Sequence, residues 1–215
     1  TGFGSINFSN LVEKVAIPAL FAPFIAGVAA LIATRLAYAI TYRGDNSKLR
    51  TGRGKYRVGQ WFSSSLVALA HGTNDGQKTM GVITLGLIAG GFVTKDSGIP
   101  LWVMISAALA IAAGTYAGGW RIIKTMGHKM VKMQPVHGFA AETTAATILY
   151  ATGYFGIPVS TTHVISTSIM GVGAAKRFSA VKWGVVERIV WAWVLTIPAS
   201  AFVAGVSYWL SLLIY

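Results

Sequence analysis

A strongly polar segment interrupts the longest apolar stretch of this chain. The apolar run from Val58 to Val93 contains at its centre His71-Gly72-Thr73-Asn74-Asp75-Gly76-Gln77-Lys78. As one helix, this run would be about 54 Å long at 1.5 Å per residue, well beyond a hydrocarbon core of about 30 Å. The sequence therefore predicts a helix that is broken between Gly72 and Gly76. Irregular backbone persists at membrane depth only where protein or a water-filled cavity satisfies it, and an intramembrane acid marks a candidate functional site.

The composition is typical of an all-α polytopic membrane protein. Hydrophobic residues make up 54% of the 215 residues and charged residues 11%, and the mean hydropathy is +0.60. The formal net charge of +12 is concentrated in three stretches between apolar spans, at about residues 41–57, 120–133 and 176–188. This is the positive-inside pattern, so we expect these stretches to be cytoplasmic loops that attract anionic membrane lipid. No nucleic-acid partner is expected, because no soluble basic face is interleaved with aromatic residues.

The apolar spans predict the membrane topology of a multi-pass protein in the cell (inner) membrane. They are residues 15–40, the broken segment 58–93, residues 101–119, a hairpin at 139–175, and residues 189–215. The broken segment should cross only once, because two crossings would put the basic loops on opposite sides. Each arm of the hairpin is shorter than the roughly 20 residues of a helical span, so we expect the hairpin to dip in and return. Both ends of the chain would then lie on the outer face.

The tip of this hairpin carries a second polar motif, Gly156-Ile157-Pro158-Val159-Ser160-Thr161-Thr162-His163. Pro158 ends the preceding segment, and Ser160 or Thr161 can cap the next helix. The unpaired N–H groups of a helix start, together with these hydroxyls, form a cradle for an anion. Helix capping alone is the simpler interpretation of this motif. A second broken helix elsewhere favours binding, because two interrupted helices that meet at the midplane form the usual site of a secondary transporter.

Two of the six acidic residues, Asp75 and Glu142, lie within the predicted membrane segments. A buried carboxylate is costly unless it is protonated, paired or bound to a cation, so each is a candidate proton or metal-ion site. An ion pair with Lys78 would make Asp75 structural, and a place near a helix start would do the same for Glu142. His71 and His163 adjoin the two polar motifs and could relay protons, although a hydrogen-bonded buried imidazole is the more common outcome.

Taken in order, the segment His71 to Lys78, then Glu142, then the segment Gly156 to His163 resemble the inorganic phosphate transporter (PiT) family. Members of that family contain two inverted repeats, each with a Gly-Ala-Asn-Asp type motif and a Pro-x-Ser-Thr-Thr-His motif. This chain shows each motif once, in a version similar to the second repeat of bacterial members. The resemblance implies one inverted repeat of a secondary transporter, with a broken helix and a helical hairpin that meet near the midplane. The other repeat, or a second chain that supplies it, is then an expected partner.

The resemblance also implies a role for each motif residue. Phosphate would be bound by Ser160, Thr161, Thr162, Asn74 and Thr73. The coupling cation, H+ or Na+, would be bound by Asp75, Asn74 and Glu142, and a metal carried with phosphate by Asp75 and Glu142. Supporting roles would fall to Gln77, Lys78, His71 and His163. No cofactor is expected beyond the coupling cation.

The leading functional prediction is symport of inorganic phosphate, coupled to H+ or Na+, with phosphate carried alone or as a metal complex. One alternative is an accessory or structural membrane subunit whose polar tips pack against a partner. A less favoured one is an intramembrane enzyme that uses Ser or Asp with His71 or His163. The chain begins with Thr and shows each motif once, so we expect it to be part of a longer transporter or to assemble with a partner. Assembly as a homo-oligomer is also expected.

Overall fold

The computed structural model describes residues 7–42 and 46–214, and within them every regular element is helical. The α-helices are α1 (Phe8–Leu11), α2 (Ile17–Tyr42), α3 (Asn46–Ala89), α4 (Leu101–Lys124), α5 (Pro135–Tyr154), α6 (Thr161–Lys176) and α7 (Trp183–Ile214). π-helical segments at Val12–Ala16 and Thr125–Met130 join α1 to α2 and extend α4, and 3-10 turns lie at Lys95–Ser97 and Phe178–Ala180. The prediction of an all-α fold is confirmed.

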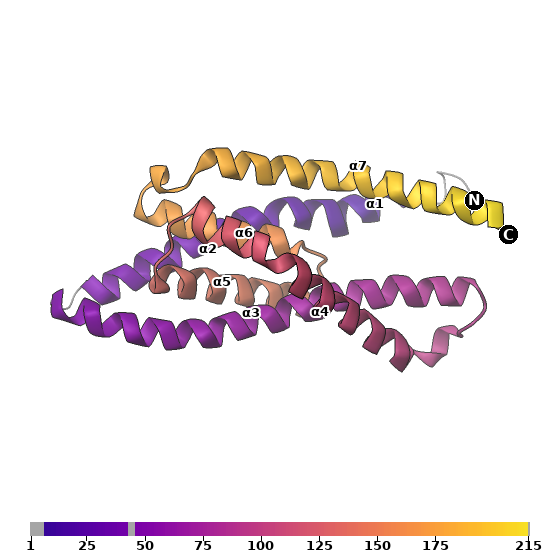
Figure 1. Cartoon of the computed structure of the whole chain (residues 1–215), viewed down its shortest axis with the longest axis horizontal. Helices are drawn as coiled ribbons and strands as arrows, with labels where there is room; N and C mark the ends of the chain where they lie inside the picture. The colour runs from indigo at the N-terminus through magenta and orange to yellow at the C-terminus, as the bar shows by residue number, and fades with distance from the viewer. Residues whose placement is uncertain (1–6, 43–45, 215) are drawn as a thin grey trace.

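The long helices run along one axis of the molecule. The start of α1 and the end of α7 lie at one end, and the connections from α4 to α5 and from α6 to α7 lie at the opposite end (Figure 1). By length and composition, three helical stretches among the described residues are able to cross a membrane: Phe8–Ile40, Leu101–Met130 and Trp183–Leu212. The polar α3 and the short α5 and α6 do not belong to this set. The chain is therefore a multi-pass membrane protein whose less apolar helices need protein around them.

The predicted break between Gly72 and Gly76 is wrong, because α3 is one continuous α-helix of 44 residues. The polar side chains of this segment bond to carbonyl groups of their own helix. The Thr73 hydroxyl donates to the Leu69 carbonyl at 2.8 Å, and the Asn74 amide donates to the Ala70 carbonyl at 2.8 Å. Glycine within a helix costs about 1 kcal/mol relative to alanine, which weakens the helix without breaking it. A helix of this length, about 66 Å, simply extends beyond the hydrocarbon core at its ends.

The basic stretches also contain more helix than the sequence predicts. The sequence predicts a loop over 41–57, but the residues from Asn46 onward form the first turns of α3. In the stretch 120–133, α4 and its π-helical extension continue to Met130. In the stretch 176–188, α7 already begins at Trp183. Lys and Arg are good helix formers, so charge alone does not indicate a loop.

The predicted helical hairpin is present as α5 and α6. α5 ends in a Schellman motif: Gly156 has a positive φ of 66°, and the Ile157 N–H donates to the Thr152 carbonyl at 2.8 Å. Ser160 then starts α6 as its N-cap, because its side chain accepts a hydrogen bond from the His163 N–H. The tip lies about midway along the molecule, and the other ends of α5 and α6 lie at the end that carries the basic stretches (Figure 1).

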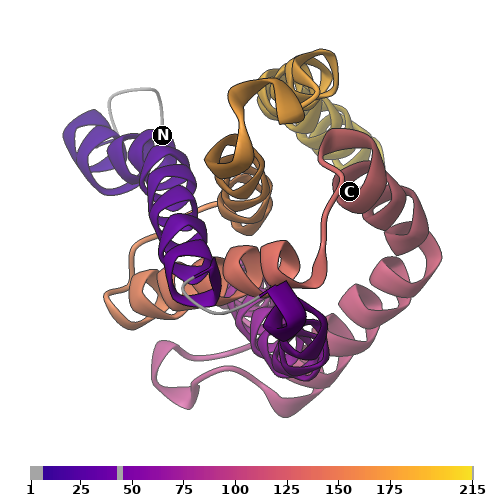
Figure 2. The ribbon, with the colours of Figure 1, turned by 90° about the vertical axis from the view of Figure 1, so that its left-hand side faces the viewer.

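Glycine allows α2 to pack directly against α6. α2, α3, α5 and α6 lie together, while α7 lies at the edge (Figure 2). A Cβ atom at Gly171 of α6 would overlap the backbone carbonyl of Gly27 in α2, and Ala26 and Ala30 on the same helix are fully buried. Small residues of this kind allow helix backbones to approach closely within membranes. This crossing holds α6, and with it the hairpin tip, against the rest of the helices.

Gly171→Ala should therefore destabilise the fold by about 1–3 kcal/mol, the usual cost of forcing extra volume into a packed core. The measurement is thermal unfolding of the purified protein in detergent. Gly114→Ala is the matched control, because a Cβ at this α4 position meets nothing within 4 Å. The control should unfold at the same temperature or higher, since alanine is the better helix former. Equal unfolding temperatures for the two variants would contradict the close packing of α2 on α6.

Candidate functional site

The two polar motifs meet where the hairpin tip packs against the middle of α3. The Thr161 hydroxyl, at the first residue of α6, lies 3.4 Å and 3.3 Å from the two carboxylate oxygens of Asp75. Thr161 is buried, and the Asp75 side chain is 36% exposed. Residues that are 86 positions apart in the chain therefore form one polar site.

Asp75 lies between two possible cations on its own helix. His71 Nε2 is 3.5 Å from one carboxylate oxygen and Lys78 Nζ is 3.8 Å from the other. Lys78 also donates to the backbone carbonyl of Val159 at 2.8 Å, so it ties the hairpin tip to α3. The ion pair that would give Asp75 a structural role is thus present in the structure. Both partners are partly exposed, which makes such pairs weak and leaves the carboxylate able to exchange them for a bound cation.

The hydroxyls of the tip are arranged for donation to an anion. Ser160 Oγ accepts the His163 N–H at 3.4 Å, so the hydrogen of this hydroxyl remains available to donate. Thr162, at the second position of α6, is exposed. The positive end of the α6 dipole lies at the same place, which favours a negative charge there.

A cavity of about 200 Å³ opens beside the tip, between α3 and the last turn of α5. From α3 it is lined by Asn74, Gln77 and Lys78, and from the hairpin it is lined by Thr152, Gly153, Gly156, Ile157 and Pro158. The Asn74 amide also lies 3.4 Å from the Leu149 carbonyl of α5, which fixes its orientation toward the hairpin. The structure thus places Asn74, Gln77 and Lys78 on the wall of one cavity.

Two of the predicted site residues lie elsewhere. Thr73 lines a different cavity, between α3 and α4, together with Ala108 and Thr115. Glu142 accepts a hydrogen bond from the Ser63 hydroxyl at 2.6 Å, three helical turns before Asp75 along α3. Among the side chains that the structure describes, no three His, Asp or Glu residues form a group able to hold a metal ion. Asp75 and Glu142 therefore do not belong to one such group.

His71 lies between these two acids. Its Nε2 atom faces Asp75, and its ring lines a cavity of about 430 Å³ that Glu142 also lines. Its Nδ1 atom is buried and has no hydrogen-bond partner. The imidazole can therefore pass a proton to Asp75 on one side, and on the other side it faces a cavity that Glu142 also lines. This placement is suitable for proton transfer between the two acids.

Comparison with known proteins agrees with the motifs and the fold. Residues 43–204 match the phosphate transporter family. The chain belongs to this family. The family resemblance that the motifs indicate is thereby confirmed, and the relatives are named as transporters, not as enzymes.

Each match to these relatives covers nearly all of this chain but only part of the relative's own length. A probable low-affinity inorganic phosphate transporter of Mycobacterium leprae is 46% identical over 210 residues, which are 97% of this chain and 50% of that protein. A protein of the same description from Bacillus subtilis is 38% identical over 100% of this chain and 63% of its own length. The chain spans about half the length of the curated relatives it matches.

A solved structure described as "The sodium-dependent phosphate transporter" has a similar fold. The TM-score is 0.68 and the identity 22%, and the match covers 97% of this chain and 62% of that chain. The arrangement of helices described above is therefore shared with that structure.

Three features of the site are not predicted from the sequence. Thr152 lines the tip cavity, Ser63 holds Glu142, and the Trp193 ring of α7 packs on His163 with ring centroids 3.9 Å apart. Ser63 has a visible signal, since it begins a run of three serines within an apolar segment. Thr152 and Trp193 have none, because they look like ordinary residues of a helix end and an interfacial aromatic belt.

Replacing Lys78 should loosen the hairpin tip. Lys78→Met removes the hydrogen bond to the Val159 carbonyl, and a hydrogen bond from a charged donor contributes about 1.5–3 kcal/mol, less at a partly exposed site such as this one. We expect the backbone amides of residues 159–163 to exchange with deuterium about tenfold faster, measured by mass spectrometry. Gln77→Met, at the neighbouring position, is the control and should leave exchange at the tip unchanged. Unchanged exchange in Lys78→Met would show that the tip does not depend on this contact.

Proposed function

We propose that this chain forms one repeat of a transporter that moves inorganic phosphate across the membrane. The observation that carries the proposal is the contact between Thr161 and Asp75, which joins the two motifs of the family at the hairpin tip. Ser160, Thr161 and Thr162 bind phosphate there, and Asn74 completes the site from α3. The names of the relatives support phosphate as the substrate.

The proposed topology places this site within the membrane. α2, α4 and α7 cross the bilayer, α3 crosses once, and the hairpin enters from the basic end and returns to it. The basic end faces the cytoplasm, because Lys and Arg accumulate on that side of cell membranes. The chain corresponds to the second repeat, and the first repeat lies in the same polypeptide or in a partner. Assembly of the transporter into a homo-oligomer stays a prediction.

Coupling follows from the charge of the site. Phosphate at neutral pH carries one to two negative charges, so placing it beside an ionised Asp75 is unfavourable unless a cation enters as well. We propose that H+ or Na+ binds at Asp75 and Asn74 and that this joint binding couples the two movements. Glu142 is a second proton or cation position, linked to the first through His71. The same electrostatic argument accommodates a divalent metal that enters together with phosphate.

Removing the tip hydroxyls should weaken phosphate binding. Ser160→Ala with Thr161→Val deletes two hydrogen-bond donors at the proposed site while keeping similar bulk. Each lost hydrogen bond to a charged group should cost about 1.5–3 kcal/mol, so loss of both should raise the apparent KM for phosphate by about a hundredfold or more. The measurement is uptake of labelled phosphate into liposomes that contain the complete transporter.

The control for this experiment removes two equivalent hydroxyls outside the site. Ser65→Ala with Thr147→Val fits, because each of these hydroxyls is exposed and bonds to a carbonyl of its own helix. The control should keep the KM of the wild type. If the site variant also keeps it, the Ser-Thr-Thr motif serves only to start α6.

Asp75→Asn tests coupling directly. The variant keeps the shape and most hydrogen-bonding capacity of the side chain but removes its charge, so phosphate no longer needs a cation to balance Asp75. We expect accumulation against a phosphate gradient to be lost, while exchange of phosphate across the liposome membrane at equal concentrations persists. Imposing an H+ gradient or a Na+ gradient separately on the wild type identifies the coupling ion.

Asp96→Asn is the matched control, because Asp96 is an exposed acid in the turn between α3 and α4. It should accumulate phosphate at the rate of the wild type. Accumulation at that rate by Asp75→Asn would rule out Asp75 as the coupling site, and Glu142→Gln would then be the variant to examine.

A further inference from the structure

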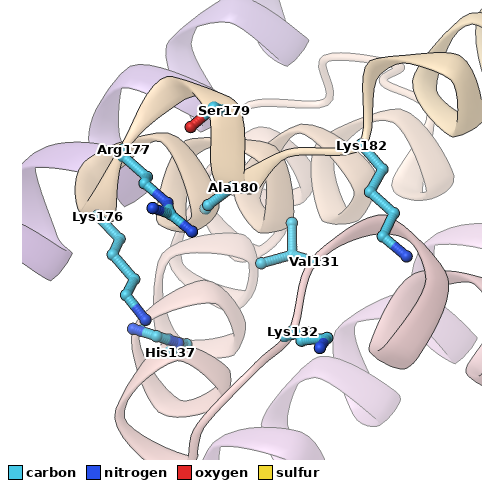
Figure 3. Close-up of a pocket in the computed structure, with 9 residues that line it drawn as sticks. Val131, Lys132, His137, Lys176, Arg177, Ser179, Ala180 and Lys182 are labelled. Carbon is cyan, nitrogen blue, oxygen red and sulfur yellow. The ribbon is translucent and has the colours of Figure 1, made fainter.

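A second polar cavity, of about 250 Å³, lies at the basic end of the molecule, far from the hairpin tip. Four cationic side chains line it: Lys132, Lys176, Arg177 and Lys182. In Figure 3 the Lys176 amine lies beside the His137 ring, and the Arg177 guanidinium lies above both. Lys132 lies below Val131, and Lys182 lies on the far side of Val131. None of these four residues belongs to the proposed transport site.

The cations are brought together by three separate segments that are packed tightly. Lys132 follows the π-helical end of α4, Lys176 and Arg177 end α6, and Lys182 precedes α7. The Lys182 N–H donates to the Met130 carbonyl at 3.0 Å, which joins the first and last of these segments. A Cβ at Gly173 would lie 2.8 Å from Val131 and 2.9 Å from Val181, so the floor of the cavity has no spare room. The cavity is thus a built feature of the fold.

This positive charge has no negative partner among the residues that line the cavity. Among the side chains that the structure describes, the ion pairs are those of Asp75 with His71 and Lys78, and no carboxylate lies among the residues that line the cavity. Gathering cations without a counter-charge is unfavourable, and it becomes favourable when an anion binds among them.

His137 is the neutral wall of this cavity. The Gln134 N–H donates to its Nδ1 at 3.1 Å, so the ring proton lies on Nε2, which bonds to the Tyr38 hydroxyl. Burial, and secondly the charge of Lys176, lower the pKa of His137, and the ring stays neutral at physiological pH. Both ring nitrogens are occupied, so the ring holds α2 against the start of α5 while the lysines and the arginine supply the charge.

We propose that this cavity binds a phosphate group at the basic surface of the membrane, carried either by an anionic phospholipid or by free inorganic phosphate. A guanidinium matches phosphate in a two-point contact, ammonium groups add point charges, and the Ser179 hydroxyl at the rim can donate as well. Basic side chains at the cytoplasmic surface attract anionic lipid by about 1 kcal/mol each. The site is independent of transport, because it involves no residue of the hairpin tip.

Amine footprinting of the complete transporter tests this site and distinguishes the two sources. The protein reacts with an acetylating reagent in detergent, in detergent with inorganic phosphate, and in nanodiscs of phosphatidylglycerol or phosphatidylcholine. Mass spectrometry then gives the extent of modification at each lysine. Lys176 and Lys182 are the reporters, and the exposed Lys124 and Lys129, outside the cavity, are internal controls.

Protection of the reporters beyond that of the controls supports the site in either arm. Protection only in phosphatidylglycerol identifies a lipid, and protection by inorganic phosphate in detergent identifies the free anion. Reporters that react like the controls in every arm overturn the proposal.

Arg177→Gln should lower the affinity of the cavity for the protecting ligand about fivefold, which is the effect of one basic residue at the surface. Arg188→Gln removes the same charge outside the cavity and should leave the protection of Lys176 and Lys182 unchanged. Equal loss in the two variants would show that only the overall charge of this end matters, which also overturns a specific site. The experiment measures lysine protection and not transport. If the proposed phosphate transport is wrong, the test of this cavity is therefore unaffected.

Discussion

The docking of the hairpin tip on α3 is the interaction on which the functional part of the molecule depends. A chain that reverses direction between two helices leaves backbone donors and acceptors unpaired, and lipid cannot satisfy them. Here the Lys78 amine satisfies the Val159 carbonyl, and Asp75 accepts from Thr161. The residues that make the reversal possible are therefore the same residues that form the polar site. The structural and functional interpretations of Asp75 and Lys78 describe one arrangement.

Much of the fold follows from the sequence, because apolar length and basic flanks strongly constrain a membrane protein. The all-α fold, the short hairpin, and the start of α6 at the Ser160 cap all follow from such patterns. The unbroken α3 does not. Polar residues and glycines within an apolar run indicate that the polar groups need hydrogen-bond partners. They do not indicate whether the backbone breaks to provide these partners or the side chains bond within a regular helix. In this helix Thr73, Asn74 and Thr79 bond to carbonyls one turn earlier, and the backbone stays regular.

The site could be predicted in part for a similar reason. Asn74, Asp75 and Thr161 are recognisable because polar groups in a membrane segment are costly unless they have a partner. Their proximity depends on how α3 packs against the hairpin, which no local pattern specifies. Thr73 illustrates the limit: it is adjacent to Asn74 in the motif, but a helix turns by about 100° per residue, and Thr73 faces α4. A motif of consecutive residues on an unbroken helix must point in several directions.

The unbroken α3 also changes how the site must work. A midplane site made from two broken helices surrounds its ligand from both sides, whereas here one hairpin tip lies against one continuous helix. The cavity beside the tip is walled only by α3 and the hairpin, and α7, the last long helix, lies at the edge of the structure with large side chains such as Phe202 and Trp209 exposed. Apolar surfaces of this size need lipid or protein against them. Under the proposed function, phosphate in such a half-open site would keep part of its water shell, and a neighbouring repeat that closes the site would remove that water. The charge of Asp75 would then act at full strength only in the closed state, which is the state in which a coupling cation is needed.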